Sequence, residues 1–228
     1  MTTQLQAVDA PVTPPDSGSS FPMFRTLGGL ALLSGCLLSL VFQLTKDRIE
    51  HNFEERVREA VFELLPGATE QNILEFTGTD ERIGEVPFTA YAGYDESGRL
   101  IGVALEAVDG NGYGGEIRFL YGYLPDKERV VGMKVLLCKE TPGLGDKIKT
   151  DENFIANFRQ LDVTLNEDAS ALEVPLSFAK PGQGGGRGQI EGISGATISS
   201  KSVFQAIDSS TRLKLPVIQH HLSELQEN

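Results

Sequence analysis

Small and hydroxylated residues gather just before an amphipathic segment near the C-terminal end of the sequence. Residues 192–200 read GISGATISS, and apolar residues then recur at near-helical spacing up to Leu213. Ser194 or Thr197 therefore lies at or just inside the N-terminus of a predicted helix. The unpaired amides and the positive end of a helix make this place suitable for a phosphate group. An ordinary Ser or Thr helix cap is the alternative, and the spacing alone leaves both open.

Two other glycine-rich stretches are weaker candidates for chemistry. Residues 110–115, GNGYGG, satisfy the G-x-G-x-x-G pattern of dinucleotide-binding proteins. Residues 116–121, EIRFLY, then alternate like a strand where that motif requires a helix, so we predict a tight loop with close backbone approach. Residues 183–188, QGGGRG, show no apolar pattern and are interpreted as a flexible loop.

The composition excludes several classes of site. The 228 residues include 20 Lys and Arg against 32 Asp and Glu, a net charge of −12. Since nucleic-acid affinity comes mostly from Lys and Arg, we expect no nucleic-acid partner. Cys36 and Cys138 are too few for a disulfide framework, a four-cysteine zinc site, a c-type haem motif or an iron–sulfur cluster. We expect no metal site, and we interpret the adjacent His220 and His221 as a solvated end.

An uncharged segment near the N-terminus predicts a membrane anchor. Residues 26–45 carry no charge, and a helix of that length spans about 30 Å, the thickness of a bilayer core. We predict one transmembrane helix over residues 23–45, after a disordered cytoplasmic tail over residues 1–22. A cleaved signal peptide or a lipoprotein acylated at Cys36 is the alternative. The apolar run is too long for the first and continues past Cys36, which disfavours the second.

The charges that flank this segment predict its orientation only weakly. Arg25 precedes it, whereas Lys46, Arg48, Arg56 and Arg58 follow it. The positive-inside rule therefore mildly favours a cytoplasmic C-terminal part.

The rest of the chain predicts one α+β domain with a mainly antiparallel sheet, because strand pairs are followed by segregated helices. Residues 46–67 form an amphipathic connector helix, residues 68–215 the domain and residues 216–228 a C-terminal tail. Gly98 suits the turn of a hairpin. The predicted strands are residues 88–94, 100–107, 116–123 and 130–138, and the predicted helices are residues 151–158 and 196 to about 213.

Three motifs, in order along the chain, resemble those of a known family. Residues 191–197, EGISGAT, are similar to the flavinylation motif Asp-x-x-Ser/Thr-Gly-Ala-Thr, with Glu191 in the place of Asp. Residues 111–115, NGYGG, and 140–145, ETPGLG, resemble two further signatures of the G subunit of the bacterial Rnf electron-transport complex. Cys138 stands where we would expect His, and we interpret it as a packed thiol.

The resemblance implies a fold and a cofactor. It implies a single N-terminal transmembrane helix followed by an FMN-binding domain, with one FMN per chain linked by a phosphoester to Thr197. The chain would be an electron carrier with no catalytic residues of its own. Ser194, Gly195 and Ala196 would admit the phosphate and the transferase, and Ser199 and Ser200 would bond near the phosphate. The ring pocket would be lined by Tyr113, Gly114, Gly115, Glu140, Thr141, Leu144 and Gly145.

The resemblance also implies partners and a location. The partners would be the subunits RnfA, RnfB, RnfC, RnfD and RnfE, a flavin transferase and membrane lipid. The complex would couple ferredoxin–NAD electron transfer to Na⁺ or H⁺ movement. The FMN domain would lie on the periplasmic side of the inner membrane, against the charge count. Two alternatives are a membrane-tethered assembly module without flavin and an NqrC-type subunit of a sodium-pumping quinone reductase.

Overall fold

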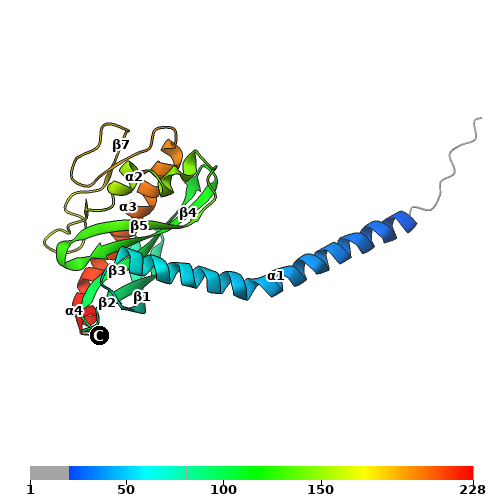
Figure 1. Ribbon diagram of the computed structural model, residues 1–228, viewed down its shortest axis with the longest axis horizontal. Coiled ribbons are helices and arrows are strands. Elements are labelled where there is room, and N and C mark those ends of the chain that lie inside the picture. The colour runs from blue at the N-terminus through cyan, green and yellow to red at the C-terminus, as the bar shows by residue number, and fades with distance from the viewer. Residues whose placement is uncertain (1–20, 81, 228) are drawn as a thin grey trace, which may run out of the picture. The chain divides into compact units, whose positions relative to one another are not determined.

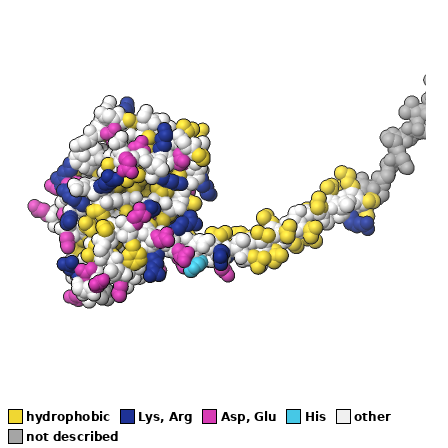
Figure 2. Space-filling view, in the orientation of Figure 1, with side chains coloured by type: hydrophobic (Ala, Val, Ile, Leu, Met, Phe, Trp, Pro, Cys, Tyr) yellow, Lys and Arg dark blue, Asp and Glu magenta, His cyan; other side chains and the backbone are white. Residues whose placement is uncertain are grey.

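Residues 21–64 form one long helix. The computed structural model describes residues 21–80 and 82–227, and the chain divides into units of residues 1–51 and 52–228. Helix α1, Phe21–Leu64, is long and apolar enough to cross a membrane, and Figure 2 shows hydrophobic side chains along its N-terminal part. The predicted span and connector form this single helix. The predicted tail lies outside the described residues, except that residues 21–22 are helical.

A six-stranded antiparallel sheet forms the centre of the second unit (Figure 1). Its strands follow one another in chain order, so each pairs with its sequence neighbour. This confirms the predicted mainly antiparallel α+β fold. The strands are β1 (Glu70–Asp80), β2 (Gly84–Tyr94), β3 (Leu100–Gly112), β4 (Gly115–Leu124), β5 (Arg129–Cys138) and β6 (Leu161–Asp162), and a separate parallel pair is β7 (Ser177–Ala179) with β8 (Gln189–Glu191).

Tight turns explain two of the strand connections. Gly98 has φ +77° between β2 and β3, and the Asp95 carboxylate accepts hydrogen bonds from the amides of Ser97 and Arg99. The predicted hairpin is therefore confirmed. Gly112 pairs with Gly115 across the next turn, so the G-x-G-x-x-G stretch joins two strands and opens no helix.

Helices cover both faces of the sheet. Helix α3, Thr197–His220, packs on one face through apolar residues that include Val203 and Ile207. The C-terminal end of α1 packs on the other face, where Val61 and Leu64 are buried with Leu120. Shorter helices follow β5: a 3₁₀ helix, Gly145–Lys149, and α2, Glu152–Ala156. The sheet thus holds the β3–β4 turn and the start of α3 in fixed positions.

The prediction of a C-terminal tail over residues 216–228 was wrong. Helix α3 continues through Pro216, and a further helix, α4 (Leu222–Gln226), follows. Ile218 and Leu225 are buried in the core, and the Tyr94 hydroxyl donates a hydrogen bond of 3.0 Å to the Leu225 carbonyl. The His221 ring lies 5.2 Å from the Phe76 ring, so it is part of this packing and not a solvated end.

Candidate functional site

Thr197 is the first residue of α3, and its side chain is exposed. Ala196 occupies the N-cap position and makes no side-chain cap hydrogen bond. Among the residues that the structure describes, the Thr197 hydroxyl has no hydrogen-bond partner. An ordinary Ser or Thr cap is therefore not what this segment forms, and the hydroxyl is available for reaction.

The loop before α3 is fixed by its backbone and by one buried serine. Gly195 has φ +81°, a conformation that favours glycine. The Ser200 hydroxyl accepts a hydrogen bond from the Ile193 amide (3.3 Å) and donates one to the Ala196 carbonyl (2.9 Å). Ser200 therefore fastens the loop to the helix and does not line the pocket, contrary to its predicted role beside a phosphate.

A pocket of about 320 Å³ lies beside Thr197. Three segments far apart in the sequence form it: the β3–β4 turn, residues 140–145 after β5, and the start of α3 with the loop before it. A larger cavity of about 820 Å³ elsewhere is lined by none of the predicted site residues. The residues that line the pocket beside Thr197 are Tyr113, Glu140, Leu144, Gly145, Gly195, Ala196, Thr197, Ile198 and Ser199.

The rim of this pocket is apolar and exposed. Tyr113 is 72% exposed, Leu144 55% and Ile198 53%, and each comes from a different segment. Large apolar side chains are usually buried, so three of them around one opening indicate a surface that binds an apolar or aromatic group. Ile198 was not predicted, although its place beside Thr197 was a signal.

Glu140 is the buried charged residue of the pocket, with 7% exposure. Its Oε1 accepts a hydrogen bond of 3.2 Å from the Gly114 amide, whereas Oε2 is buried and has no partner among the described residues. A Cβ atom at Gly112 or Gly145 would lie within 3 Å of this carboxylate. Glycines at these positions therefore make room for Glu140.

Other predicted residues lie next to the pocket but do not line it. Ser194 is exposed on the loop before α3, and Thr141 is exposed beside Glu140. Gly114 packs against the Lys139 carbonyl, and Gly115 has φ +111°. These two glycines shape the turn that places Tyr113, which confirms the predicted tight loop.

Glu191, the first residue of the segment 191–197, binds backbone amides outside the pocket. Its carboxylate accepts hydrogen bonds from the amides of Gly182 (2.5 Å) and Gly184 (3.2 Å). Asn157 donates to the Glu191 carbonyl and accepts from the Glu191 amide. These hydrogen bonds hold β8 and the glycine-rich loop before it together. The composition of the loop did not indicate these bonds.

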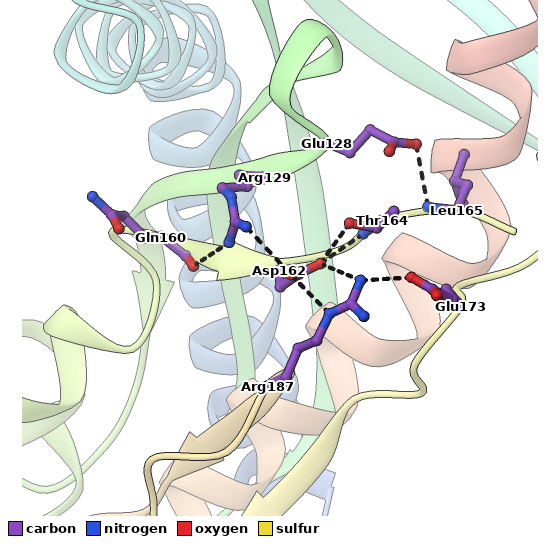
Figure 3. Close-up of polar contacts among 8 residues, drawn as sticks. All are labelled: Glu128, Arg129, Gln160, Asp162, Thr164, Leu165, Glu173 and Arg187. Carbon is purple, nitrogen blue, oxygen red and sulfur yellow. Dashed lines mark hydrogen bonds and ion pairs between the residues drawn. The ribbon is translucent and has the colours of Figure 1, made fainter.

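An ion-pair cluster fixes the other end of that loop (Figure 3). Arg187 binds Asp162 (2.9 Å) and Glu173 (2.6 Å), and Arg129 lies 3.4 Å from Asp162. Burial raises the pKa of the Asp162 carboxyl, but hydrogen bonds from Arg187 and Thr164 outweigh it and lower this pKa to about 2. The cluster therefore joins β5, β6 and the loop before β8.

The cysteines and histidines of residues 21–80 and 82–227 form no metal site of three or more ligands. No group of three or more His, Cys, Asp or Glu side chains in this part of the chain can hold a metal ion. Cys36 and Cys138 are free, and Cys138 packs against the core as predicted.

Comparison with known proteins identifies the family. Residues 112–211 match the family described as an FMN-binding domain. The G subunit of the ion-translocating oxidoreductase complex of Methanosarcina acetivorans is 31% identical over 195 residues, which cover 86% of this chain and 94% of the relative. This chain belongs to the RnfG family. The RnfG proteins of Haemophilus influenzae (30% identical, 83% and 87% covered) and Vibrio cholerae (29%, 79% and 83%) are further relatives.

The fold of this RnfG family member resembles a solved structure. The crystal structure of Shewanella oneidensis NqrC matches with a TM-score of 0.59 at 16% identity, over 78% of this chain and 100% of that chain. At this identity the likeness concerns the fold alone.

Proposed function

We propose that this chain is an electron-relay subunit of a membrane-bound, ion-translocating ferredoxin:NAD oxidoreductase complex. It carries one FMN, linked by a phosphoester to Thr197. The observation that carries the proposal is the free, exposed Thr197 hydroxyl at the start of α3, in the lining of a pocket with an apolar rim. The match to an FMN-binding domain and the names of the relatives support it.

The residues at the site suit the parts of FMN. The phosphate would lie at the N-terminus of α3, where backbone amides lack partners and the helix dipole is positive. Tyr113, Leu144 and Ile198 would hold the aromatic ring. Bound FMN supplies one- and two-electron transfer at its isoalloxazine ring. The exposed rim leaves the pocket accessible to the cofactor of a partner subunit.

A flavin transferase with a flavin dinucleotide as donor would attach the group. The Thr197 oxygen forms a bond to the flavin-side phosphorus while the pyrophosphate bond breaks. A nucleoside monophosphate leaves with the electron pair of that bond, and the hydroxyl proton passes to solvent. No electron is gained or lost in this exchange, and the exposure of Thr197 gives the transferase access.

The family supports a proposal for the partners and the location. The name that the relatives share describes one subunit of an ion-translocating complex, and we propose RnfA, RnfB, RnfC, RnfD and RnfE as the other subunits. Helix α1 would anchor the chain in the inner membrane. The FMN domain would lie on the periplasmic side, where we expect the transferase, although the positive-inside count favours the opposite side.

The alternative proposal is a membrane-tethered assembly module without flavin, or an NqrC-type subunit that carries the same flavin in a quinone reductase. In-gel fluorescence separates flavin from no flavin. Coexpression with the transferase should give a fluorescent band on a denaturing gel, and Thr197→Ala should remove it. Thr150→Ala, at an exposed threonine outside the pocket, is the matched control and should keep it. A dark wild-type band with transferase present would exclude the covalent flavin.

A further inference from the structure

Two polar groups without partners lie at the same end of the pocket. Glu140 Oε2 is buried and makes no hydrogen bond to the described residues, although Oε1 of the same carboxylate does. Ser199 is also buried, and its hydroxyl has no hydrogen-bond partner in the same part of the chain. A buried polar atom without a partner is unfavourable, so a ligand that donates a hydrogen bond to Glu140 Oε2 would gain affinity here.

Gly145 brings these two groups to one spot. A Cβ atom at Gly145 would lie within 3 Å of both Glu140 Oε2 and the Ser199 hydroxyl oxygen. The two oxygens therefore lie less than about 6 Å apart, and a side chain at position 145 would clash with both. Both residues line the pocket beside Thr197.

The pair offers one acceptor and one donor to a ligand. A carboxylate oxygen only accepts hydrogen bonds when ionised, and a serine hydroxyl can donate. The complementary ligand edge is an N–H next to a carbonyl oxygen, which is the imide edge of a flavin ring. We infer that Glu140 accepts the imide N–H of the isoalloxazine ring and that Ser199 donates to the adjacent carbonyl. This inference rests on the proposed function and names the groups that orient the ring.

The test compares FMN with its N3-methyl analogue, which lacks the imide N–H. The full chain is purified in detergent from a host without the transferase, and dissociation constants are measured by flavin fluorescence. For the wild type we expect FMN to bind about tenfold to a hundredfold more tightly than N3-methyl-FMN, the range for a hydrogen bond to a charged group. In Glu140→Gln, which retains an acceptor for the Gly114 amide, this ratio should fall to near one. Glu152→Gln, at an exposed carboxylate, is the control.

A serine pair provides the second arm. Ser199→Ala should weaken FMN and N3-methyl-FMN by the same factor, about threefold to tenfold, because both retain the carbonyl. Ser209→Ala, at an exposed serine of α3 outside the pocket, should weaken neither. Equal affinity of the wild type for the two flavins, or a ratio that survives Glu140→Gln, would overturn the inference while flavin binding itself stands. If neither flavin binds and the transferase leaves the chain unmodified, the proposed function fails as well.

Discussion

At the scale of single residues, the site depends on small side chains as much as on reactive ones. Thr197 supplies the hydroxyl, but the position of Glu140 depends on the absence of side chains at Gly112 and Gly145. Gly145 itself has no unusual backbone conformation, so the close approach of Glu140 and Ser199 is the reason for glycine there.

Gly145→Ala tests this dependence on space. The added methyl group would lie within 3 Å of Glu140 and Ser199, and such overpacking costs about 1–3 kcal/mol. We expect a lower free energy of unfolding in denaturant titration and a smaller fraction of flavin-carrying chain by absorbance. Gly110→Ala, where a Cβ would have no neighbour within 4 Å, should change neither. Full flavin loading in Gly145→Ala would refute the spatial argument.

Sequence motifs singled out Thr197 and most of the residues that line the pocket, but they could not predict which side chains face it. Ser199 and Ser200 are adjacent and alike, yet successive helix residues point about 100° apart. Ser199 lines the pocket, whereas Ser200 bonds the preceding loop. The contact between Glu140 and Gly114 joins residues far apart in sequence, and no local pattern indicates it.

At the scale of elements, the loop before β8 is held at both ends. The Glu191 carboxylate accepts hydrogen bonds from the amides of Gly182 and Gly184 near the start of the loop. Near the end of the loop, Arg187 forms ion pairs with Asp162 and Glu173. Because β8 leads directly into the segment with Thr197, the ion-pair cluster stabilises the part of the chain that carries the proposed modification site.

Asp162→Asn tests the cluster through pH. The pKa of Asp162 is lowered to about 2 in the folded chain, so its stabilisation is complete above the unfolded value and is lost as pH falls through about 2. We expect the variant to lose about 2 kcal/mol of unfolding free energy at pH 7, and the difference from wild type to shrink from pH 4 to pH 2. A difference that is constant with pH would contradict this account. Asp126→Asn, at an exposed side chain, is the control.

The elements missed from the sequence had mixed patterns. Strand β1 lies at the sheet edge, where exposed Ile73 and several polar residues obscure the alternation. Helix α3 was predicted to end at about residue 213, but Leu215, Ile218 and Leu225 continue the apolar spacing past Pro216 and are buried. Tertiary packing therefore outweighed the local signal.

At the scale of the whole molecule, orientation is where the residues and the family disagree. The positive charges after the apolar segment favour a cytoplasmic domain, whereas we propose a periplasmic one. Alkaline phosphatase, which is active only after export, can be fused after residue 228. We expect an active fusion, and an inactive β-galactosidase fusion at the same site. The opposite pair of results would place the domain in the cytoplasm.

Peptide mass spectrometry can locate the proposed covalent flavin on Thr197. The chain is coexpressed with the transferase, digested and fragmented. We expect the peptide with Thr197 to gain the mass of one FMN less one water. The fragment ions should place this group on Thr197, and no other peptide should carry it. An unmodified Thr197 peptide, or a flavin on another residue, would contradict the account.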